Sequence, residues 1–261
     1  MNLGLEGKVA LVLGAGGGLG RAIALALASE GAKVALADVN KQSLEETAAA
    51  LEPTGAQVQL IEWDFADLSI VDQRISVIEK ALGTVDVLVN NTGGPAPTPA
   101  SGQPSESWQR GFEMMVLSVI AITDRVLPGM RAKQWGRVIT SASSGVIAPI
   151  ANLGLSNALR MTLVGWSKTL SREVARDGIT ANVIVPGRIA TARIRFLDEA
   201  KANRENRSVE EVASESTGSI PAGRYGEPSE YADTVTFLAS ERASYITGST
   251  IRVDGGLIAS V

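Results

Sequence analysis

The stretch Leu13–Gly20, with the sequence LGAGGGLG, joins an apolar run of strand length to a segment of helix length. Glycines at such a junction allow a tight turn, and they let backbone N–H groups approach a pyrophosphate that the N-terminus of the following helix also attracts. A glycine-rich loop alone is equally consistent with a flexible turn, so the segments on either side of it must distinguish the two interpretations. The apolar run Lys8–Leu13 precedes it and the small-residue segment Arg21–Ala28 follows it. We therefore predict a strand–turn–helix unit that binds a dinucleotide. The residues expected to contact it are Gly14, Gly16, Gly18, Leu19 and Gly20.

Apolar runs of strand length alternate with helix-length segments through the rest of the chain. The runs are rich in Val, Ile and Leu and do not alternate with polar residues, which is typical of a parallel sheet covered on both faces. This order indicates right-handed βαβ units. We predict a single α/β domain over residues 1–261, of the Rossmann type, with a doubly wound parallel sheet of about seven strands and helices on both faces. The predicted strands are Lys8–Leu13, Lys33–Ala37, Val58–Glu62, Val85–Val89, Arg137–Ser141, Thr180–Val185 and Ser249–Val253. The predicted helices are Leu19–Glu30, Lys41–Leu51, Ile70–Leu82, Pro104–Lys133, Ala151–Arg176 and Ser229–Ser240.

Two segments interrupt this alternation. Gly93–Gln103 is rich in glycine and proline and is expected to form a loop. Residues 194–224 are long, polar and weakly helical in pattern, which suggests a mobile lid. Both segments follow strands, and ligands of open α/β sheets bind at the carboxyl ends of the strands. We therefore expect both to shape a substrate site.

Composition excludes several classes of function. The chain has no cysteine and no histidine, so disulfides, Cys/His zinc sites and Ser-His-Asp or Cys-His mechanisms are ruled out. We find no carboxylate cluster that suggests a metal, and no metal site is predicted. The net charge of −4 leaves no broad basic surface, so we expect no nucleic-acid partner. Apolar stretches such as Met114–Ile122 are too short to span a bilayer. We expect no membrane partner and a cytoplasmic location.

Asp38 closes the second predicted strand, downstream of the glycine-rich turn. A carboxylate at this place accepts hydrogen bonds from both hydroxyls of an adenosine ribose and repels a 2′-phosphate. No arginine lies within this turn, and Lys41 is expected to begin the next helix on a solvated face. The predicted cofactor is therefore NAD, with NADP less favoured.

The spacing Gly14-x3-Gly18-x-Gly20 resembles that of the short-chain dehydrogenase/reductase superfamily, with Leu13 where a threonine is usual. The similarity is greatest to its 3-oxoacyl-acyl-carrier-protein-reductase-like members. Further segments fit the family in the same order along the chain. They are Asp64-Phe65, Asn90-Asn91-Thr92-Gly93, Asn182, Pro186-Gly187-Arg188-Ile189-Ala190-Thr191, Gly223-Arg224 with Glu227-Pro228, and Thr247-Gly248 with Val253-Asp254-Gly255-Gly256. The resemblance implies that Asp64 and Phe65 contact adenine and that residues 186–191 hold the nicotinamide carboxamide. The cofactor contacts implied in this way are Asp64, Phe65, Asn91, Gly93, Pro186, Gly187, Ile189 and Thr191.

The resemblance is incomplete at the catalytic end. Family members use a serine, a tyrosine and a lysine four residues after the tyrosine, often with an asparagine on an earlier helix. The segment Lys168–Glu173 fixes the register and places Arg160 at the lysine position and Ser156 at the tyrosine position. The serine is present as Ser143, whereas Met115 aligns best with the asparagine. We predict that Ser143, Ser156 and Arg160 form the catalytic site.

Three functions remain open on this basis. The first is an NAD(H)-dependent oxidoreductase that interconverts a small-molecule secondary alcohol and a carbonyl, in which Ser143 polarises the carbonyl and Arg160 clamps the nicotinamide ribose. The second is a non-catalytic NAD-binding protein, such as a sensor. The third is a lyase or isomerase that uses Ser156 and Arg160 to stabilise an oxyanion. The family also implies a homodimer or homotetramer, built on the helices predicted at Pro104–Lys133 and Ala151–Arg176.

Overall fold

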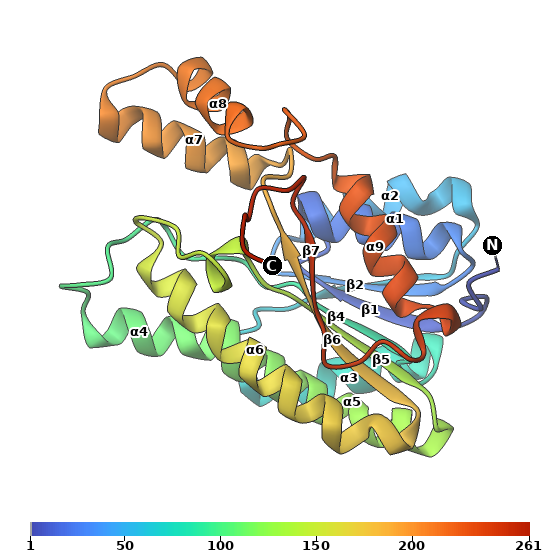
Figure 1. The fold of residues 1–261 in the computed structure, drawn as a ribbon. Coiled ribbons are helices and arrows are strands. Elements are labelled where there is room, and N and C mark those ends of the chain that lie inside the picture. The colour runs from blue at the N-terminus through green and yellow to red at the C-terminus, as the bar shows by residue number, and fades with distance from the viewer. Residues whose placement is uncertain (1) are drawn as a thin grey trace.

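Seven parallel strands form one twisted sheet in the order β3-β2-β1-β4-β5-β6-β7. This computed structural model describes residues 2–261. Figure 1 shows the sheet at the centre of the molecule with helices on both of its faces. The strand order reverses between β1 and β4, and such a switch point opens a crevice at the carboxyl ends of the strands. The strands are β1 Val9–Leu13, β2 Lys33–Asp38, β3 Val58–Glu62, β4 Val87–Asn90, β5 Gly136–Ser141, β6 Ile179–Pro186 and β7 Thr250–Val253. The predicted fold class is confirmed.

The helices divide into two layers around this sheet. One layer holds α1, α2 and α9, and the other holds α3, α5 and α6. Their bounds are α1 Gly18–Ser29, α2 Lys41–Leu51, α3 Val71–Leu82, α4 Ser105–Phe112, α5 Ser118–Lys133, α6 Gly154–Val174, α7 Ala192–Glu205, α8 Val209–Gly218 and α9 Pro228–Ala239. The six helices predicted from the sequence are present, with ends that differ by a few residues.

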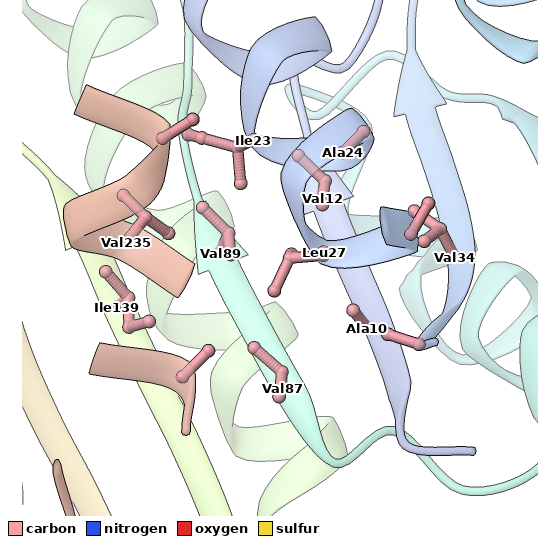
Figure 2. Packing of buried hydrophobic residues seen from close by; sticks show 14 of the residues in the cluster. Ala10, Val12, Ile23, Ala24, Leu27, Val34, Val87, Val89, Ile139 and Val235 are labelled. Carbon is pink, nitrogen blue, oxygen red and sulfur yellow. The ribbon is translucent and has the colours of Figure 1, made fainter. Parts of the chain in front are cut away.

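Strand β1 is apolar at every position because it is buried from both sides. Ala10 and Val12 join the cluster beneath α1 and α9, whereas Leu11 and Leu13 join the cluster beneath α3 and α5. Figure 2 shows the first of these clusters, where Leu27 of α1 packs over the sheet. Successive side chains of a strand point to opposite faces, so a strand in a three-layer fold needs apolar residues throughout.

The segment predicted as one helix, Pro104–Lys133, contains a change of helix type. A π-helical segment, Glu113–Leu117, connects α4 to α5. Next to it, the Ser118 hydroxyl donates a hydrogen bond to the carbonyl of Met114 at 2.6 Å. Met115, Val116 and Val119 pack against Leu155, Leu159 and Leu163 of α6. The apolar stretch Met114–Ile122 is thus largely buried within the subunit, and homo-oligomer formation stays a prediction.

The segment 194–224 was predicted as a mobile lid without a defined helix, and its mobility stays a prediction. Two well-formed helices, α7 and α8, occupy most of it and pack against each other above the sheet (Figure 1). Thr191 caps α7 by accepting a hydrogen bond from the Ile194 amide, and Ser208 with Glu211 forms a capping box at the start of α8. Residues 93–103 form the predicted loop, with one isolated bridge between Thr98 and Leu153. In the part of the chain that the structure describes, no helix has the length and apolar character needed to span a bilayer.

Candidate active site

A cavity of about 500 Å³ opens at the carboxyl ends of the strands. Its walls come from the glycine-rich turn, from the segments that follow β2 to β6, and from the start of α7. The predicted site residues that line it are Gly14, Gly18, Leu19, Asp38, Asp64, Phe65, Asn91, Gly93, Ser143, Ser156, Arg160, Pro186, Gly187, Ile189 and Thr191. Gly16 and Gly20 are not part of this lining. The fold therefore brings residues from the whole length of the chain to one site.

The glycine-rich turn leaves no room for side chains at several of its positions. Gly14 has a φ of +64°, and a Cβ there would lie 2.4 Å from the carbonyl oxygen of Asn91. A Cβ at Gly20 would lie 2.0 Å from the Gly14 carbonyl oxygen. At Gly18 it would lie 2.7 Å from the methyl carbon of Thr191. Gly20 thus packs the first helix turn against the loop from behind, while Gly14 and Gly18 face the cavity. A dinucleotide pyrophosphate fits this cradle because only glycine allows the backbone to come so close.

Asp38 is fixed by the same turn. Its two carboxylate oxygens accept hydrogen bonds from the backbone amides of Gly16, at 3.1 Å, and Asn40, at 3.0 Å. A Cβ at Gly16 would lie 2.8 Å from the Cβ of Ser43 and 3.1 Å from the Asp38 carboxyl group, which explains why this position is glycine although it does not line the cavity. The half-buried carboxylate lines the cavity beside Val39. It stands where a ribose hydroxyl pair would be recognised.

An aromatic wall lies on the same side of the cavity. The rings of Trp63 and Phe65 meet edge to face, with centroids 5.6 Å apart. Between them in sequence, Asp64 is held by a hydrogen bond from the Ala66 amide to its side chain at 3.0 Å. Trp63 was not predicted as a site residue, because the sequence places it only as the residue after a strand. Phe65 is half-buried and can offer its ring to an adenine base, whereas Trp63 is 1% exposed and supports that ring from the core.

Two segments on the far side of the switch point complete the cofactor half. Asn91 donates from its side-chain amide to the Leu13 carbonyl at 3.3 Å and so joins the ends of β1 and β4. The Gly187 amide donates to Val253, and a Cβ at Gly187 would lie 2.5 Å from the Cα of Asp254. This contact fixes the path of the chain from Pro186 to Thr191 along the cavity.

Ser143 and Ser156 place two hydroxyl groups at the other end of the cavity. Ser143 follows β5, and its oxygen accepts a hydrogen bond from the Gly145 amide at 3.1 Å, which leaves its proton free to be donated. Ser156 is in the first turn of α6 and is 7% exposed. Ile150 and Leu153 supply apolar lining next to them, whereas Val146 packs in a separate core cluster.

Arg160 lies one helical turn after Ser156 and is 7% exposed. Its guanidinium group donates to the backbone carbonyls of Ser141, at 3.1 Å, of Thr92, at 2.9 Å, and of Gly93, at 3.2 Å. These hydrogen bonds use three of the five N–H donors of an arginine and connect the ends of β4 and β5. Burial, and to a lesser degree the positive charge of Arg193, lower the pKa of Arg160 to about 10, so the group stays protonated at neutral pH. The ribose contact expected of Arg160 stays a prediction.

Other residues at this end were not predicted from the sequence. Arg193, near the start of α7, lines the cavity and donates to the Pro95 carbonyl at 2.7 Å. Arg188 also lines the cavity and forms an ion pair with the buried Asp198 at 3.1 Å. Their only sequence signal is a cluster of basic residues after Gly187. Met115, at the position of the family asparagine, is fully buried, and its neighbour Met114 lines the cavity instead.

Comparison with known proteins identifies the family. The family model described as enoyl-(acyl carrier protein) reductase matches residues 14–258. The 3-oxoacyl-[acyl-carrier-protein] reductase FabG of Escherichia coli (strain K12) is 37% identical over 259 residues, which is 98% of this chain and 99% of the relative. The chain belongs to the short-chain dehydrogenase/reductase (SDR) superfamily. As an SDR it falls among the NAD(P)-dependent oxidoreductases.

Solved SDR structures agree with this fold over nearly the whole chain. L-Sorbose reductase from Gluconobacter frateurii, in complex with NADPH and L-sorbose, superposes with a TM-score of 0.94 at 32% identity and covers 100% of both chains. NAD⁺-bound xylitol dehydrogenase superposes with a TM-score of 0.90 at 28% identity and covers 97% of this chain and 99% of its own. One of these SDR neighbours is bound to NADPH and the other to NAD⁺, so family membership leaves the choice of cofactor to local residues.

Proposed function

We propose that this SDR is an NAD(H)-dependent oxidoreductase that interconverts a secondary alcohol and a carbonyl compound. The observation that carries the proposal is the shared cavity. The glycine-rich turn and Asp38 form one end of it, and the hydroxyl groups of Ser143 and Ser156 form the other. A dinucleotide whose adenosine half lies at the glycine-rich turn and Asp38 would place its nicotinamide ring at the serine end of the same cavity.

Asp38 favours NAD over NADP. Its carboxylate lines the cavity and is fixed by two backbone amides, so it cannot easily turn away from a ligand. An adenosine ribose with free hydroxyls can donate hydrogen bonds to it, whereas a 2′-phosphate would place negative charge against negative charge. Several SDR neighbours are NADPH-bound, which makes the cofactor preference a matter for direct titration.

The residues at the serine end can hold and polarise a carbonyl oxygen. Bound NAD(H) supplies the hydride chemistry. Ser143 can donate a hydrogen bond to the substrate oxygen because its hydroxyl accepts from the Gly145 amide while its proton is engaged by none of the described residues. Ser156 can hold a water molecule that exchanges a proton with the same oxygen. Arg160 is charged and buried behind both, and its field stabilises negative charge that develops on that oxygen.

Turnover with defined carbonyl compounds tests this proposal. Purified protein is assayed for oxidation of NADH and NADPH against a panel of ketones and aldehydes. We expect turnover with NADH, and a loss of about 10²-fold in kcat/KM for Ser143→Ala, as is typical when one donor to a developing oxyanion is removed. Thr162→Ala, at an exposed position on the same helix as Ser156, serves as the control and should change little. Tight NADH binding without turnover of any carbonyl would contradict the proposal.

One observation favours a second candidate, a non-catalytic NAD-binding protein. Among the described residues that line the cavity there is no tyrosine and no lysine, so the usual proton donor of an SDR is missing. The double variant Ser156→Tyr with Arg160→Lys separates the two candidates. A scaffold that lacks only its acid should gain activity, because a positioned general acid typically contributes on the order of 10²–10⁴ in rate. If the unaltered protein turns over rapidly and the double variant is inactive, Ser156 and Arg160 form a functional site of their own.

A further inference from the structure

Charge is distributed unevenly along the cavity. Its two carboxylates, Asp38 and Asp64, both lie at the adenine end, beside the glycine-rich turn and Phe65. Its three guanidinium groups, those of Arg160, Arg188 and Arg193, all come from the segments that form the opposite end. Among the residues that the structure describes, only Arg188 of these three has an acidic partner, Asp198. The serine end therefore carries uncompensated positive charge.

Arg193 is the more accessible of the two guanidinium groups without an acidic partner. It is half-buried, and burial lowers its pKa from the ordinary value. Its hydrogen bond to the Pro95 carbonyl uses one nitrogen, Nη2. Across residues 2–261, no side chain accepts a hydrogen bond from its Nε or Nη1, and no carboxylate oxygen lies within 4.0 Å of it. Nε and Nη1 of Arg193 are thus able to donate hydrogen bonds to a ligand in the cavity.

Arg160 and Arg193 converge on the same point of the loop after β4. A Cβ placed on Gly94 would lie 3.3 Å from Nη2 of Arg193 and 3.7 Å from Nη2 of Arg160. Two cations held this close without a carboxylate repel each other and lose hydration, which costs free energy. An anion that entered the cavity at this point would offset both effects. Charge-assisted hydrogen bonds to a guanidinium are also among the strongest that a protein can make to a carboxylate or phosphate.

We propose that Arg193, backed by the charge of Arg160, binds an anionic group of the substrate, so that the site prefers carbonyl compounds and alcohols that carry a carboxylate or a phosphate. This proposal rests on the proposed oxidoreductase function and names its substrate class. The same guanidinium chemistry could instead serve the pyrophosphate of the cofactor. The contacts favour the substrate, because Arg193 lies against Gly94 and Pro95, whereas Thr191 is the residue that packs against the glycine-rich turn.

The test compares ligands that differ only in the acid. One pair is 4-oxopentanoate and its methyl ester, and the other is dihydroxyacetone phosphate and dihydroxyacetone. Binding to the protein is measured by calorimetry in the presence of NAD⁺, which cannot reduce a ketone, so that no turnover occurs during the titration. Arg193→Gln is compared with Arg195→Gln, since Arg195 is on the same helix, is exposed and already pairs with Glu199 at 3.0 Å. Melting curves establish that both variants are folded.

We expect the protein to bind at least one acid more tightly than its uncharged partner. Arg193→Gln should lower the affinity for that acid roughly ten- to a hundredfold, as expected for the loss of a charge-assisted pair. The affinities for the uncharged ligand and for NADH should not change. Arg195→Gln should change none of them. Equal binding of acid and uncharged ligand by the unaltered protein would overturn the proposal.

Three further outcomes separate this proposal from the functional one. If Arg193→Gln weakens NADH and ADP-ribose instead of the acids, the guanidinium serves the cofactor and the substrate proposal is wrong. If acids bind through Arg193 but no carbonyl is ever reduced, the anion site stands and the oxidoreductase function fails. If uncharged ketones are reduced as efficiently as acids, the function stands and the anion preference fails.

Discussion

The two ends of the cavity differ in how much of their surface is formed by backbone and how much by side chains. At the cofactor end the shape of the turn is set by the backbone, since Gly14, Gly18 and Gly20 leave no space for a Cβ, and two backbone amides hold the carboxylate of Asp38. At the catalytic end the chemistry depends on side chains, namely those of Ser143, Ser156 and Arg160. A substitution at one of these glycines would displace the backbone of the turn itself. A site made of side chains can be altered residue by residue on the same fold, and this is the end where the chain departs from the family pattern.

Arg160 shows how such an alteration can become structural. A lysine at this position would present one compact ammonium group, whereas the planar guanidinium reaches three carbonyls at once. These carbonyls belong to Ser141, Thr92 and Gly93, at the ends of two neighbouring strands. The residue at the catalytic lysine position therefore also supports the floor of the cavity.

Removal of this support should give the largest effect. Arg160→Met leaves three buried carbonyls without their donor, so we expect the free energy of unfolding to fall by about 3 kcal/mol, at roughly 1 kcal/mol for each carbonyl. Arg172→Met, at an exposed position on the same helix, is the control and should change it by less than about 0.5 kcal/mol. Chemical denaturation of both variants measures the difference. Equal stabilities would show that Arg160 contributes little to the fold and is free for a catalytic contact.

The backbone end can be tested by the addition of one methyl group. Gly20→Ala places a Cβ 2.0 Å from the Gly14 carbonyl oxygen, so the turn must shift, and we expect a loss of about 2 kcal/mol in stability together with weaker NADH binding. Gly17→Ala is the matched control for stability, because Gly17 has an extended backbone and no heavy atom within 4 Å of its Cβ position. Denaturation and NADH titration measure the two effects. If both variants are equally stable, close packing of the turn is not what requires glycine at position 20.

The sequence predicted which residues line the two ends of the cavity, with the exceptions of Gly16 and Gly20, whereas the roles of these residues stay predictions. Glycine spacing and the position of Asp38 depend on neighbours within a short stretch, which a sequence displays directly. The alignment with the family, which segment 168–173 fixes, was enough to predict that Ser143, Ser156 and Arg160 lie in one cavity. The partners of Arg160 could not be predicted, because they are backbone carbonyls distant in sequence, at Thr92 and Gly93.

The helices α7 and α8 were missed because their residues are mostly polar and leave a weak hydrophobic pattern. Their boundaries were nevertheless marked by local signals, since Thr191 caps the first and Ser208 with Glu211 forms a capping box on the second. Arg193 was missed for a different reason. Its importance arises only when α7 meets the loop at Gly94 and Pro95, a contact between segments far apart in the chain.

Replacement of Asp38 should act on cofactor choice and leave the fold intact. Asp38→Ala removes the carboxylate that would oppose a 2′-phosphate, and it also removes the acceptor for the ribose hydroxyls. We expect NADH to bind less tightly and NADPH more tightly, so that the ratio of the two affinities changes by about tenfold or more, as removal of a close like-charge contact implies. Fluorescence titration of the unaltered protein and the variant with both cofactors measures this ratio. Tighter binding of NADPH than of NADH by the unaltered protein would contradict the role given to Asp38.

The smallest effect is expected at the surface ion pairs that join α7 to α8. Glu215 accepts hydrogen bonds from Lys201 and Arg207, and these contacts lower its pKa to about 2. A carboxyl group whose pKa is lower in the folded state stabilises that state fully above its usual pKa of 4.5, and the contribution is lost as the pH falls from 4.5 towards 2. Glu215→Gln should therefore lower the melting temperature slightly at pH 7. The difference should shrink as the pH falls through this range, because the unaltered protein loses the same charge, and it should also shrink in high salt, because the pairs are exposed. Melting curves of both proteins across pH and salt measure it. A difference that persists at low pH would mean that Glu215 acts through packing, and that α7, with Arg193 near its start, is held to α8 by something other than charge.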